Sequence, residues 1–174
     1  MKSKHSSGVH QLQPITALLS TTYNPLAGGG GADKCIDGIT NSADGNLCHS
    51  QIEAAPWLVL DFGEGAKVSI ERVLLYNRED SAAARTKNVE VRLSNELPTS
   101  SATMYSGGFL LGTFQGPAVP SEIVEIKAGT WSTWPGHGRY LIVQLNHMNP
   151  MNNNDYLNLV EAVAFGVHLY EGKI

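Results

Sequence analysis

Hydrophobic and polar residues alternate along much of the chain with a period of two. The pattern is clearest where Val89, Val91 and Leu93 alternate with charged residues, because an extended strand then places the three apolar side chains on one face. Clusters of Gly, Pro, Asn and Asp interrupt the pattern about every ten residues, which is typical of antiparallel strands joined by turns. The pattern predicts strands over residues 15–22, 57–62, 68–77, 88–94, 123–126, 139–145 and 157–170, the last with a break near Gly166.

The longest segments between these strands show no regular pattern of hydrophobic and polar residues. These longer loops cover residues 23–31, 37–50, 79–87 and 146–155. A β-sandwich or jelly roll presents such loops together at its ends, where a rigid scaffold positions binding residues. We therefore predict an all-β fold: a single antiparallel β-sandwich (jelly roll) with functional loops at one end.

The size and composition of the chain fit one such domain. With 174 residues, of which 42% are hydrophobic, the chain has enough apolar material for a single core. Helical periodicity, internal repeats and a second domain are not visible in the sequence. We expect residues 1–13 to form a flexible leader and residues 14–172 to form the domain.

Charge and hydropathy argue against two classes of partner. The chain has 12 Lys and Arg against 16 Asp and Glu, a net charge of −4, and so lacks the cationic field that holds nucleic acid. Its longest apolar stretches, such as 57–60, fall far short of the roughly 20 residues that cross a bilayer. Residues 1–13 also lack the apolar core of a secretory signal, so the sequence assigns no compartment.

The sequence motifs of common enzymes are absent. The chain has no Gly-x-Ser-x-Gly elbow, no His-Glu-x-x-His, no Walker A loop and no Cys-x-x-Cys. The four glycines at 28–31 are not a dinucleotide fingerprint, because no Gly-x-Gly-x-x-Gly spacing there follows a strand and opens a helix. We therefore expect a binding protein rather than an enzyme.

The two cysteines, Cys35 and Cys48, stand close together in the sequence. They are too few for a four-cysteine zinc site and fit either a disulfide that closes a short loop or two buried thiols. A disulfide is the expectation for an oxidising compartment, where closing such a loop stabilises the fold by about 3 kcal/mol.

One loop carries a distinctive charged pattern. Arg78 and Asp80 follow the strand predicted over 68–77, and Arg85 stands at the far end of a run of small residues. Guanidinium groups are planar multiple donors that suit vicinal hydroxyls and ring oxygens, and a neighbouring carboxylate can hold one arginine rotamer. The pattern indicates either a binding site of this kind or a solvated ion-pair cluster.

In its flanking context, this pattern resembles the fucose-binding signature of the F-type lectins (fucolectins), which belong to the discoidin-like, galactose-binding-like superfamily. Other landmarks of the family occur in the same order, and the resemblance covers about residues 14–170. They are an Asp-Gly turn at 36–38, a Trp-x-x-x-Asp strand at 56–63, and closing strands at 138–145 and 156–166.

The resemblance implies a jelly roll whose loop end binds terminal L-fucose through two arginines and a histidine. Arg78 and Arg85 match the arginines, His49 would be the histidine, and Asp80 would orient an arginine rather than touch the sugar. Three donors would converge on hydroxyls and the ring oxygen, while an apolar wall takes the methyl group of the sugar.

The chain departs from the family pattern close to the expected sugar. His49 follows Cys48 directly, where the family has one residue between them, and Ser81 and Ala82 replace the adjacent cysteines of some members. A smaller and softer surface there leaves the selectivity between fucose and galactose open. Loop residues that could contact the methyl group are Tyr23, Leu26 and Leu47.

The resemblance also implies a structural calcium ion. The ligands of the family map onto the side chains of Asp37 and Glu161 and onto backbone carbonyls near Lys34 and Ile39. Oxygen ligands suit a hard cation, and a bound ion would tie a loop to the closing strand. Without an ion, Asp37 would form a plain Asx turn and Glu161 would be a solvent-facing strand position.

The leading hypothesis is a non-enzymatic lectin for fucosylated glycans or glycoconjugates in an extracellular setting. Because a single monosaccharide site binds weakly, a homo-oligomer would supply avidity. One alternative is a carbohydrate-binding module of galactose-like specificity from a larger enzyme. Another is a discoidin-type module that adheres to lipids or proteins through exposed apolar residues, for which only 23–26 is a weak candidate.

Overall fold

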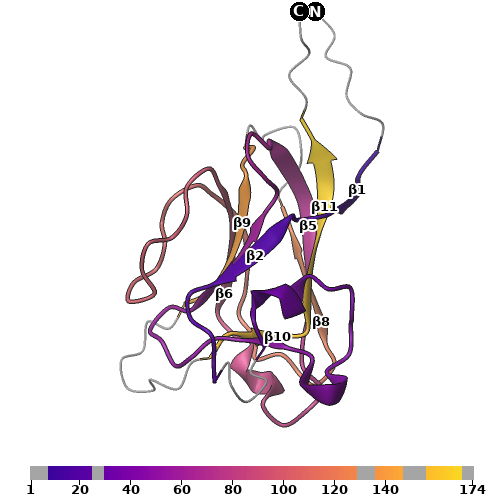
Figure 1. The fold of residues 1–174 in the computed structure, drawn as a ribbon, viewed down its shortest axis with the longest axis vertical. Coiled ribbons are helices and arrows are strands. Elements are labelled where there is room, and N and C mark those ends of the chain that lie inside the picture. The colour runs from indigo at the N-terminus through magenta and orange to yellow at the C-terminus, as the bar shows by residue number, and fades with distance from the viewer. Residues whose placement is uncertain (1–7, 25–29, 129–135, 147–155, 170–174) are drawn as a thin grey trace, which may run out of the picture.

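Two antiparallel β-sheets face each other in the structure (Figure 1). The computed structural model describes residues 8–24, 30–128, 136–146 and 156–169. In chain order the strands are β1 (His10–Leu12), β2 (Thr16–Leu19), β3 (Cys48–His49), β4 (Trp57–Asp61), β5 (Val68–Tyr76), β6 (Val89–Ser94), β7 (Phe109–Phe114), β8 (Ile123–Lys127), β9 (Tyr140–Leu145), β10 (Asn158–Leu159) and β11 (Glu161–His168). Short 3₁₀ helices, η2 (Ala32–Cys35), η3 (Ala43–Gly45) and η4 (Ala83–Arg85), lie in the loops.

The strand order is that of a β-sandwich. One sheet has the order β1-β11-β5-β8, the other has β2-β4-β9-β6-β7, and β3 pairs with β10 in a separate ribbon. All of these pairings are antiparallel. The predicted break in the last strand is a register shift between Phe165 and Gly166. The prediction of an all-β fold with one antiparallel sandwich is confirmed.

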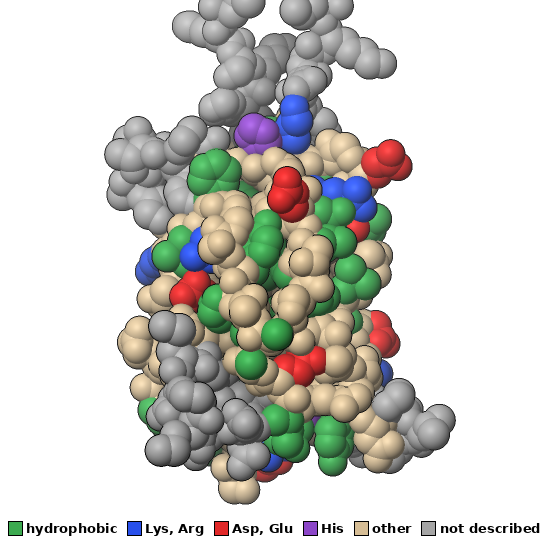
Figure 2. Space-filling view, turned by 90° about the vertical axis from the view of Figure 1, so that its left-hand side faces the viewer, with side chains coloured by type: hydrophobic (Ala, Val, Ile, Leu, Met, Phe, Trp, Pro, Cys, Tyr) green, Lys and Arg blue, Asp and Glu red, His purple; other side chains and the backbone are tan. Residues whose placement is uncertain are grey.

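Acidic, basic and hydrophobic side chains are interspersed on the side of the molecule that Figure 2 shows. The described side chains of this side do not gather into a single basic or apolar patch. Within the described part of the chain, no helix is long and apolar enough to cross a membrane.

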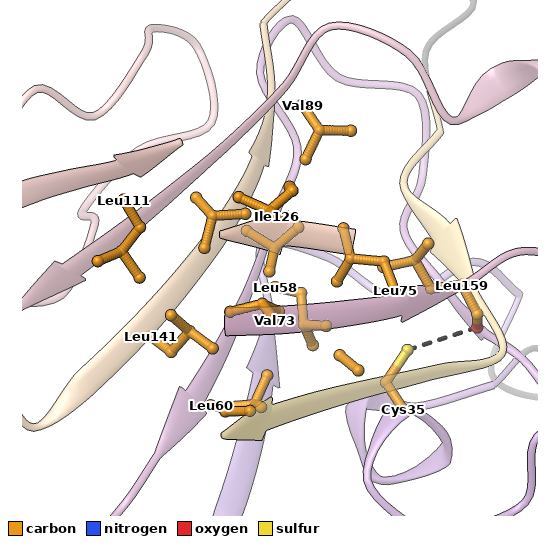
Figure 3. Close-up of a cluster of buried hydrophobic side chains, with 14 of the residues drawn as sticks. Cys35, Leu58, Leu60, Val73, Leu75, Val89, Leu111, Ile126, Leu141 and Leu159 are labelled. Carbon is orange, nitrogen blue, oxygen red and sulfur yellow. Dashed lines mark hydrogen bonds between the residues drawn. The ribbon is translucent and has the colours of Figure 1, made fainter. Parts of the chain in front are cut away.

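The main core fills the space between the two sheets (Figure 3). Leu58 and Leu60 contribute to it from β4, and Val73 and Leu75 from β5, all four fully buried. The residues of each pair are two positions apart, as the alternating pattern requires for side chains on one face. Burial of each such side chain stabilises the fold by about 1.5–3 kcal/mol.

The alternate positions of β4 pack on the outer face of the same sheet. Val59 forms a second buried cluster with Tyr140 and Ile142 of β9, and Trp57 and Tyr105 pack against it. The loop that carries Tyr105 therefore covers part of this outer face.

The strands that the sequence did not predict are short or at an edge. β1 lies within residues 1–13, which were expected to form a flexible leader, yet Leu12 is buried and β1 pairs with β11. Its three residues are too few to display a period of two. In the edge strand β7, Phe109 and Leu110 are both exposed and Gly112 follows, so apolar and polar positions do not alternate.

The two ends of the sandwich differ in what they carry. Because β5 begins at Val68 and ends at Tyr76, residues 62–67 lie at one end and residues 77–87 at the other. The 3₁₀ helices and the ribbon of β3 and β10 gather at this second end, which is the lower end in Figure 1 and lies away from the last residues of β11. We refer to it as the loop end, and to the other as the turn end.

Candidate functional site

Asn77, directly after β5, anchors the loop that carries the two arginines. It is buried, and its amide group donates to the carbonyl oxygens of Ala83 at 3.1 Å and Val119 at 3.0 Å. Its side-chain oxygen accepts a hydrogen bond from the Thr86 hydroxyl at 2.9 Å. One buried amide thus ties both ends of the segment 78–85. Nothing local in the sequence marks Asn77 as an anchor of this loop, because an Asn after a strand is an ordinary turn signal.

Asp80 holds Arg78 through a two-pronged ion pair. Nε and Nη2 of Arg78 each lie 2.5 Å from a carboxylate oxygen of Asp80. The Arg78 guanidinium lowers the pKa of Asp80 below its ordinary value, so the pair stays charged at neutral pH. The Arg78 side chain is only 13% exposed, whereas that of Asp80 is 57% exposed. Among the described residues, the buried Nη1 of Arg78 has no hydrogen-bond partner.

Arg85 ends the helix η4 and is held differently. Its guanidinium carbon lies 4.6 Å from the centre of the Tyr156 ring, in a cation–π contact. In the described part of the chain, no carboxylate forms an ion pair with Arg85. The two arginines of one loop are therefore fixed by two different interactions.

His49 lies in β3, where the ribbon with β10 pairs it with Asn158. The residue is only 9% exposed. Burial is the main cause that lowers the pKa of His49, and the charges of Arg78 and Arg85 lower it further, against a hydrogen bond to Ser50 that raises it. The structure thus brings the predicted histidine close enough to both predicted arginines for their charges to act on it.

The hydrogen bond of His49 indicates which of its two ring nitrogens carries the proton and which is left for a ligand. Nδ1 lies 2.7 Å from the carbonyl oxygen of Ser50. Because a carbonyl can only accept, Nδ1 carries the proton, and Nε2 of the neutral ring is an acceptor. With this tautomer, the neutral site would offer two guanidinium donors and one imidazole acceptor instead of the three donors that we expected from the sequence.

Two tyrosines surround the imidazole. The Tyr23 ring centre lies 4.7 Å from that of His49, and the Tyr156 ring meets His49 edge-on at 5.0 Å. The two tyrosine rings meet each other edge-on at 5.8 Å. Tyr23 is 44% exposed, so it presents an aromatic face at the rim of the site.

Of the other residues considered for an apolar wall, Leu47 is half-buried and Leu26 lies outside the described residues. Tyr156 was not among the predicted site residues. The sequence indicates only that Tyr156 begins the closing strand at 156–166. No neighbouring residue predicts its contact with Arg85.

Glu161 and Asp37, the expected calcium ligands, lie together at the loop end. Glu161 opens β11 and is only 4% exposed, so the alternative of a solvent-facing position is wrong. Its Oε1 accepts a hydrogen bond from the Gly38 N–H at 3.3 Å, and its buried Oε2 has no partner among the described residues. Burial, with a smaller effect of the Asp37 charge, raises the pKa of Glu161 to about 7.

The remaining contacts of Asp37 fit the alternative of a plain turn as well. Its Oδ1 accepts a hydrogen bond from the Ile39 N–H at 2.9 Å, as in an Asx turn, and its Oδ2 lies 3.8 Å from Nζ of Lys34. The described residues contain no group of three or more His, Cys, Asp and Glu side chains placed to hold a metal ion. An ion bound here would need backbone carbonyls to complete its ligand set.

A disulfide joins Cys35 of η2 to Cys48 of β3, with Cα atoms 5.3 Å apart. This decides between the two alternatives that the sequence left open and confirms the disulfide. The Cys35 sulfur lies 3.4 Å from the carbonyl oxygen of Leu159 in β10 (Figure 3). The bond therefore fixes the segment before Asp37 against the ribbon that carries His49.

Comparisons with known proteins point to carbohydrate-binding domains. Residues 34–111 match the family model of an F5/F8 type C domain, described as a NedA-like, galactose-binding domain. No curated protein matches the chain.

Solved structures with a similar fold include lectins and sugar-binding modules. A fucolectin from striped bass (Morone saxatilis) serum has a TM-score of 0.73 and 22% identity, over 93% of this chain and 50% of that chain. The present chain thus spans about half the length of that lectin. A fucose-binding module of Streptococcus pneumoniae has a TM-score of 0.62 and 19% identity, over 93% of this chain and 99% of that chain. The lectin domain of lectinolysin, in complex with Lewis B antigen, has a TM-score of 0.62 and 24% identity, over 86% of this chain and 91% of that chain.

Proposed function

We propose that this chain, which has the jelly-roll fold of the fucolectins and matches a galactose-binding domain model over residues 34–111, is a non-enzymatic lectin that binds terminal L-fucose. The observation that carries the proposal is the convergence of Arg78, Arg85 and His49 at the loop end. The fucose-binding module and the lectin domain named above have similar folds and support the choice of sugar.

The donors and the acceptor of the site suit a sugar hydroxyl. A hydroxyl group accepts hydrogen bonds through its lone pairs and donates one through its proton. Arg78 and Arg85 would donate to the sugar oxygens, and Nε2 of neutral His49 would accept a hydroxyl proton. Because the site uses both capacities of the hydroxyl, an ether or a ketone at the same position would bind more weakly.

The exposed Tyr23 ring supplies the wall for the methyl group. It lies beside His49, so a sugar held by the imidazole would place one side against an aromatic face. An apolar methyl gains from this contact, while a hydroxymethyl group would lose part of its hydration there. We therefore propose L-fucose over L-galactose, which differs from it by one hydroxyl at C6.

Calcium would act as a structural ion beside the site. The buried carboxylate of Glu161 has an oxygen without a partner among the described residues and lies near the charge of Asp37. Two carboxylates in this position fit a hard divalent cation, with carbonyls near Lys34 and Ile39 completing the ligand set. The ion would neutralise the buried charge and tie the turn at 36–38 to β11.

The proposed partners are fucosylated glycans or glycoconjugates. One monosaccharide site gives weak binding, and a homo-oligomer would raise the effective affinity for a multivalent surface. Sedimentation of the purified chain at several concentrations tests the oligomer.

Calorimetric titration with free sugars tests the function. L-fucose, L-galactose, D-arabinose and D-galactose are titrated into the wild-type chain, since D-arabinose keeps the fucose ring and lacks its methyl group. Arg85→Ala is expected to weaken fucose binding about thirtyfold or more, because it removes charged hydrogen bonds. Arg72→Ala is the matched control, because Arg72 also stacks on an aromatic ring, that of Phe165 at 4.5 Å, but on the β5–β11 pair.

The outcomes separate the candidate functions. Fucose binding that Arg85→Ala removes and Arg72→Ala leaves intact supports the lectin. Binding of D-galactose in preference to fucose would favour a module of galactose-like specificity. Absence of binding to all four sugars at millimolar concentration would overturn the proposal and favour an adhesion module.

A further inference from the structure

The two site arginines differ in how many hydrogen-bond donors their partners use. Asp80 takes Nε and Nη2 of Arg78 and leaves Nη1. The central carbon of the Arg85 guanidinium lies over the Tyr156 ring, 4.6 Å from the ring centre. A stacked ring fixes the plane of a guanidinium without using its N–H groups, which point outward from its edges.

Tyr156 contacts the third site residue at the same time. Its ring meets the imidazole of His49 edge-on at 5.0 Å, and it also contacts Tyr23. Tyr156 lies two residues before Asn158, which pairs with His49 across the ribbon of β3 and β10. The segment that leads into β10, the strand paired with β3, therefore also carries the ring that contacts Arg85.

We propose that Tyr156 is a positioning residue of the sugar site. Its ring lies beneath the Arg85 guanidinium and in a T-shaped contact with the His49 ring, and it positions Arg85 without a carboxylate that would take up the donors of the guanidinium. A carboxylate in its place would hold Arg85 equally well but would consume two of those donors, as Asp80 does for Arg78. This inference rests on the proposed function for its ligand and on the ring contacts for its mechanism.

Two substitutions separate the ring from its hydroxyl. Tyr156→Phe keeps the aromatic face and is expected to bind L-fucose within about twofold of the wild type. Tyr156→Leu removes the face at similar size and is expected to weaken fucose binding about tenfold, as for the loss of a partly buried cation–π contact. Phe165→Leu is the matched control, because it removes the ring beneath Arg72 and is expected to leave fucose affinity unchanged.

A second measurement does not depend on the sugar. Protons above an aromatic face resonate upfield, so the Arg85 Nε–H signal in a ¹⁵N spectrum reports the stacking; its assignment follows from its absence in Arg85→Lys. The signal is expected at its upfield position in the wild type and Tyr156→Phe, and shifted downfield in Tyr156→Leu. If Tyr156→Leu does not fold, Tyr156→Met serves as the ring-free variant.

The results distinguish a positioning role of Tyr156 from a direct contact of its hydroxyl with the sugar and from no role at all. A tenfold loss in the ring-free variant, rescue by Phe, an intact Phe165→Leu control and a shifted Arg85 signal support the proposal. Equal losses in Tyr156→Phe and Tyr156→Leu would overturn it in favour of a direct contact by the hydroxyl. Unchanged affinity in Tyr156→Leu would overturn it as well. If the wild type binds no fucose while the Arg85 signal still follows the ring, the sugar function fails and only the stacking geometry is supported.

Discussion

The two ends of the sandwich each hold an arginine–aspartate pair, and the two pairs are built differently. At the turn end, Nε and Nη2 of Arg139 lie 2.7 Å from the carboxylate oxygens of Asp61, which is buried at the end of β4. The pair joins residues 78 positions apart in the sequence. At the loop end, Arg78 and Asp80 are two positions apart, and Asp80 is exposed.

The difference lies in which polar atoms are left without partners. Asp61 also accepts the Gly63 N–H at 2.8 Å, so both of its oxygens are used. At the loop end, Nη1 of Arg78 and Oε2 of Glu161 are buried and have no partner among the described residues. A buried unpaired polar group costs stability, and the proposed sugar and ion would remove that cost at the loop end. The same pair of residue types therefore leaves no carboxylate oxygen unpaired at the turn end and one guanidinium nitrogen unpaired at the loop end.

Asp61→Asn is expected to have the largest effect on stability. It removes the charge from a buried carboxylate at the end of β4 that pairs with the partly exposed Arg139 just before β9, and we expect the free energy of unfolding to fall by about 1.5–3 kcal/mol. Denaturant titration measures the loss, and fucose affinity in the same sample should not change. A loss of sugar binding without a loss of stability would contradict the division between the two ends.

The same pair predicts how stability depends on pH. Arg139 lowers the pKa of Asp61 in the folded chain, so the pair stabilises the fold above the ordinary aspartate pKa of about 3.9. This contribution is lost as the pH falls through the lowered folded value. The stabilities of the wild type and Asp61→Asn should therefore converge in acid, and a constant difference down to the lowest pH would refute this origin.

Calcium is expected to stabilise the folded chain through the carboxylates of the loop end and not through those of the turn end. At a concentration one hundred times the dissociation constant, a single bound ion adds about 2.7 kcal/mol. Thermal unfolding with calcium or with a chelator measures the shift, which Glu161→Gln should abolish and Asp61→Asn should retain. An identical Tm of the wild type in millimolar calcium and in chelator would show that the carboxylates bind no calcium.

Asp80→Asn should have the opposite signature to Asp61→Asn. Since Asp80 is exposed, its charge contributes little to stability, within about 1 kcal/mol. Fucose binding is expected to weaken about tenfold, because Arg78 loses the carboxylate that fixes its donors. Calorimetry and denaturant titration on one preparation give both numbers. A large loss of stability with unchanged affinity would make the pair at the loop end structural too.

The smallest expected effect is the pH dependence of sugar binding. The pKa of His49 is lowered, so the ring stays neutral and accepts a hydroxyl proton down to a pH below about 6.5. Protonation turns Nε2 into a donor, and fucose affinity should fall, by about fivefold at most, as the pH drops through the lowered pKa of His49. Asp80 stays ionised in this range because its pKa is also lowered. His49→Gln should bind more weakly with a flat pH profile, and affinity that rises in acid would show that His49 donates.

Local sequence patterns predicted the strands of the core and the residues of the arginine loop. β4, β5, β6 and β9 were found because alternating apolar residues reflect the period of a strand. Arg78, Asp80 and Arg85 share one short segment, so their proximity is a property of the local chain. β1 and β7 were missed, because three residues or an exposed edge leave no alternation to detect.

The sequence by itself determined the all-β class, the strands with alternating apolar residues and the closeness of two arginines in one loop, because each depends on neighbours along the chain. Only the tertiary structure decided the disulfide, the burial of Glu161, the hydrogen bond between Nδ1 of His49 and Ser50, and the contact of Arg85 with the Tyr156 ring. These features depend on segments that the sheet pairings bring together from distant parts of the chain. The physical reason is that burial, electrostatic shifts and ring contacts follow distances in space, which the order of residues does not encode locally.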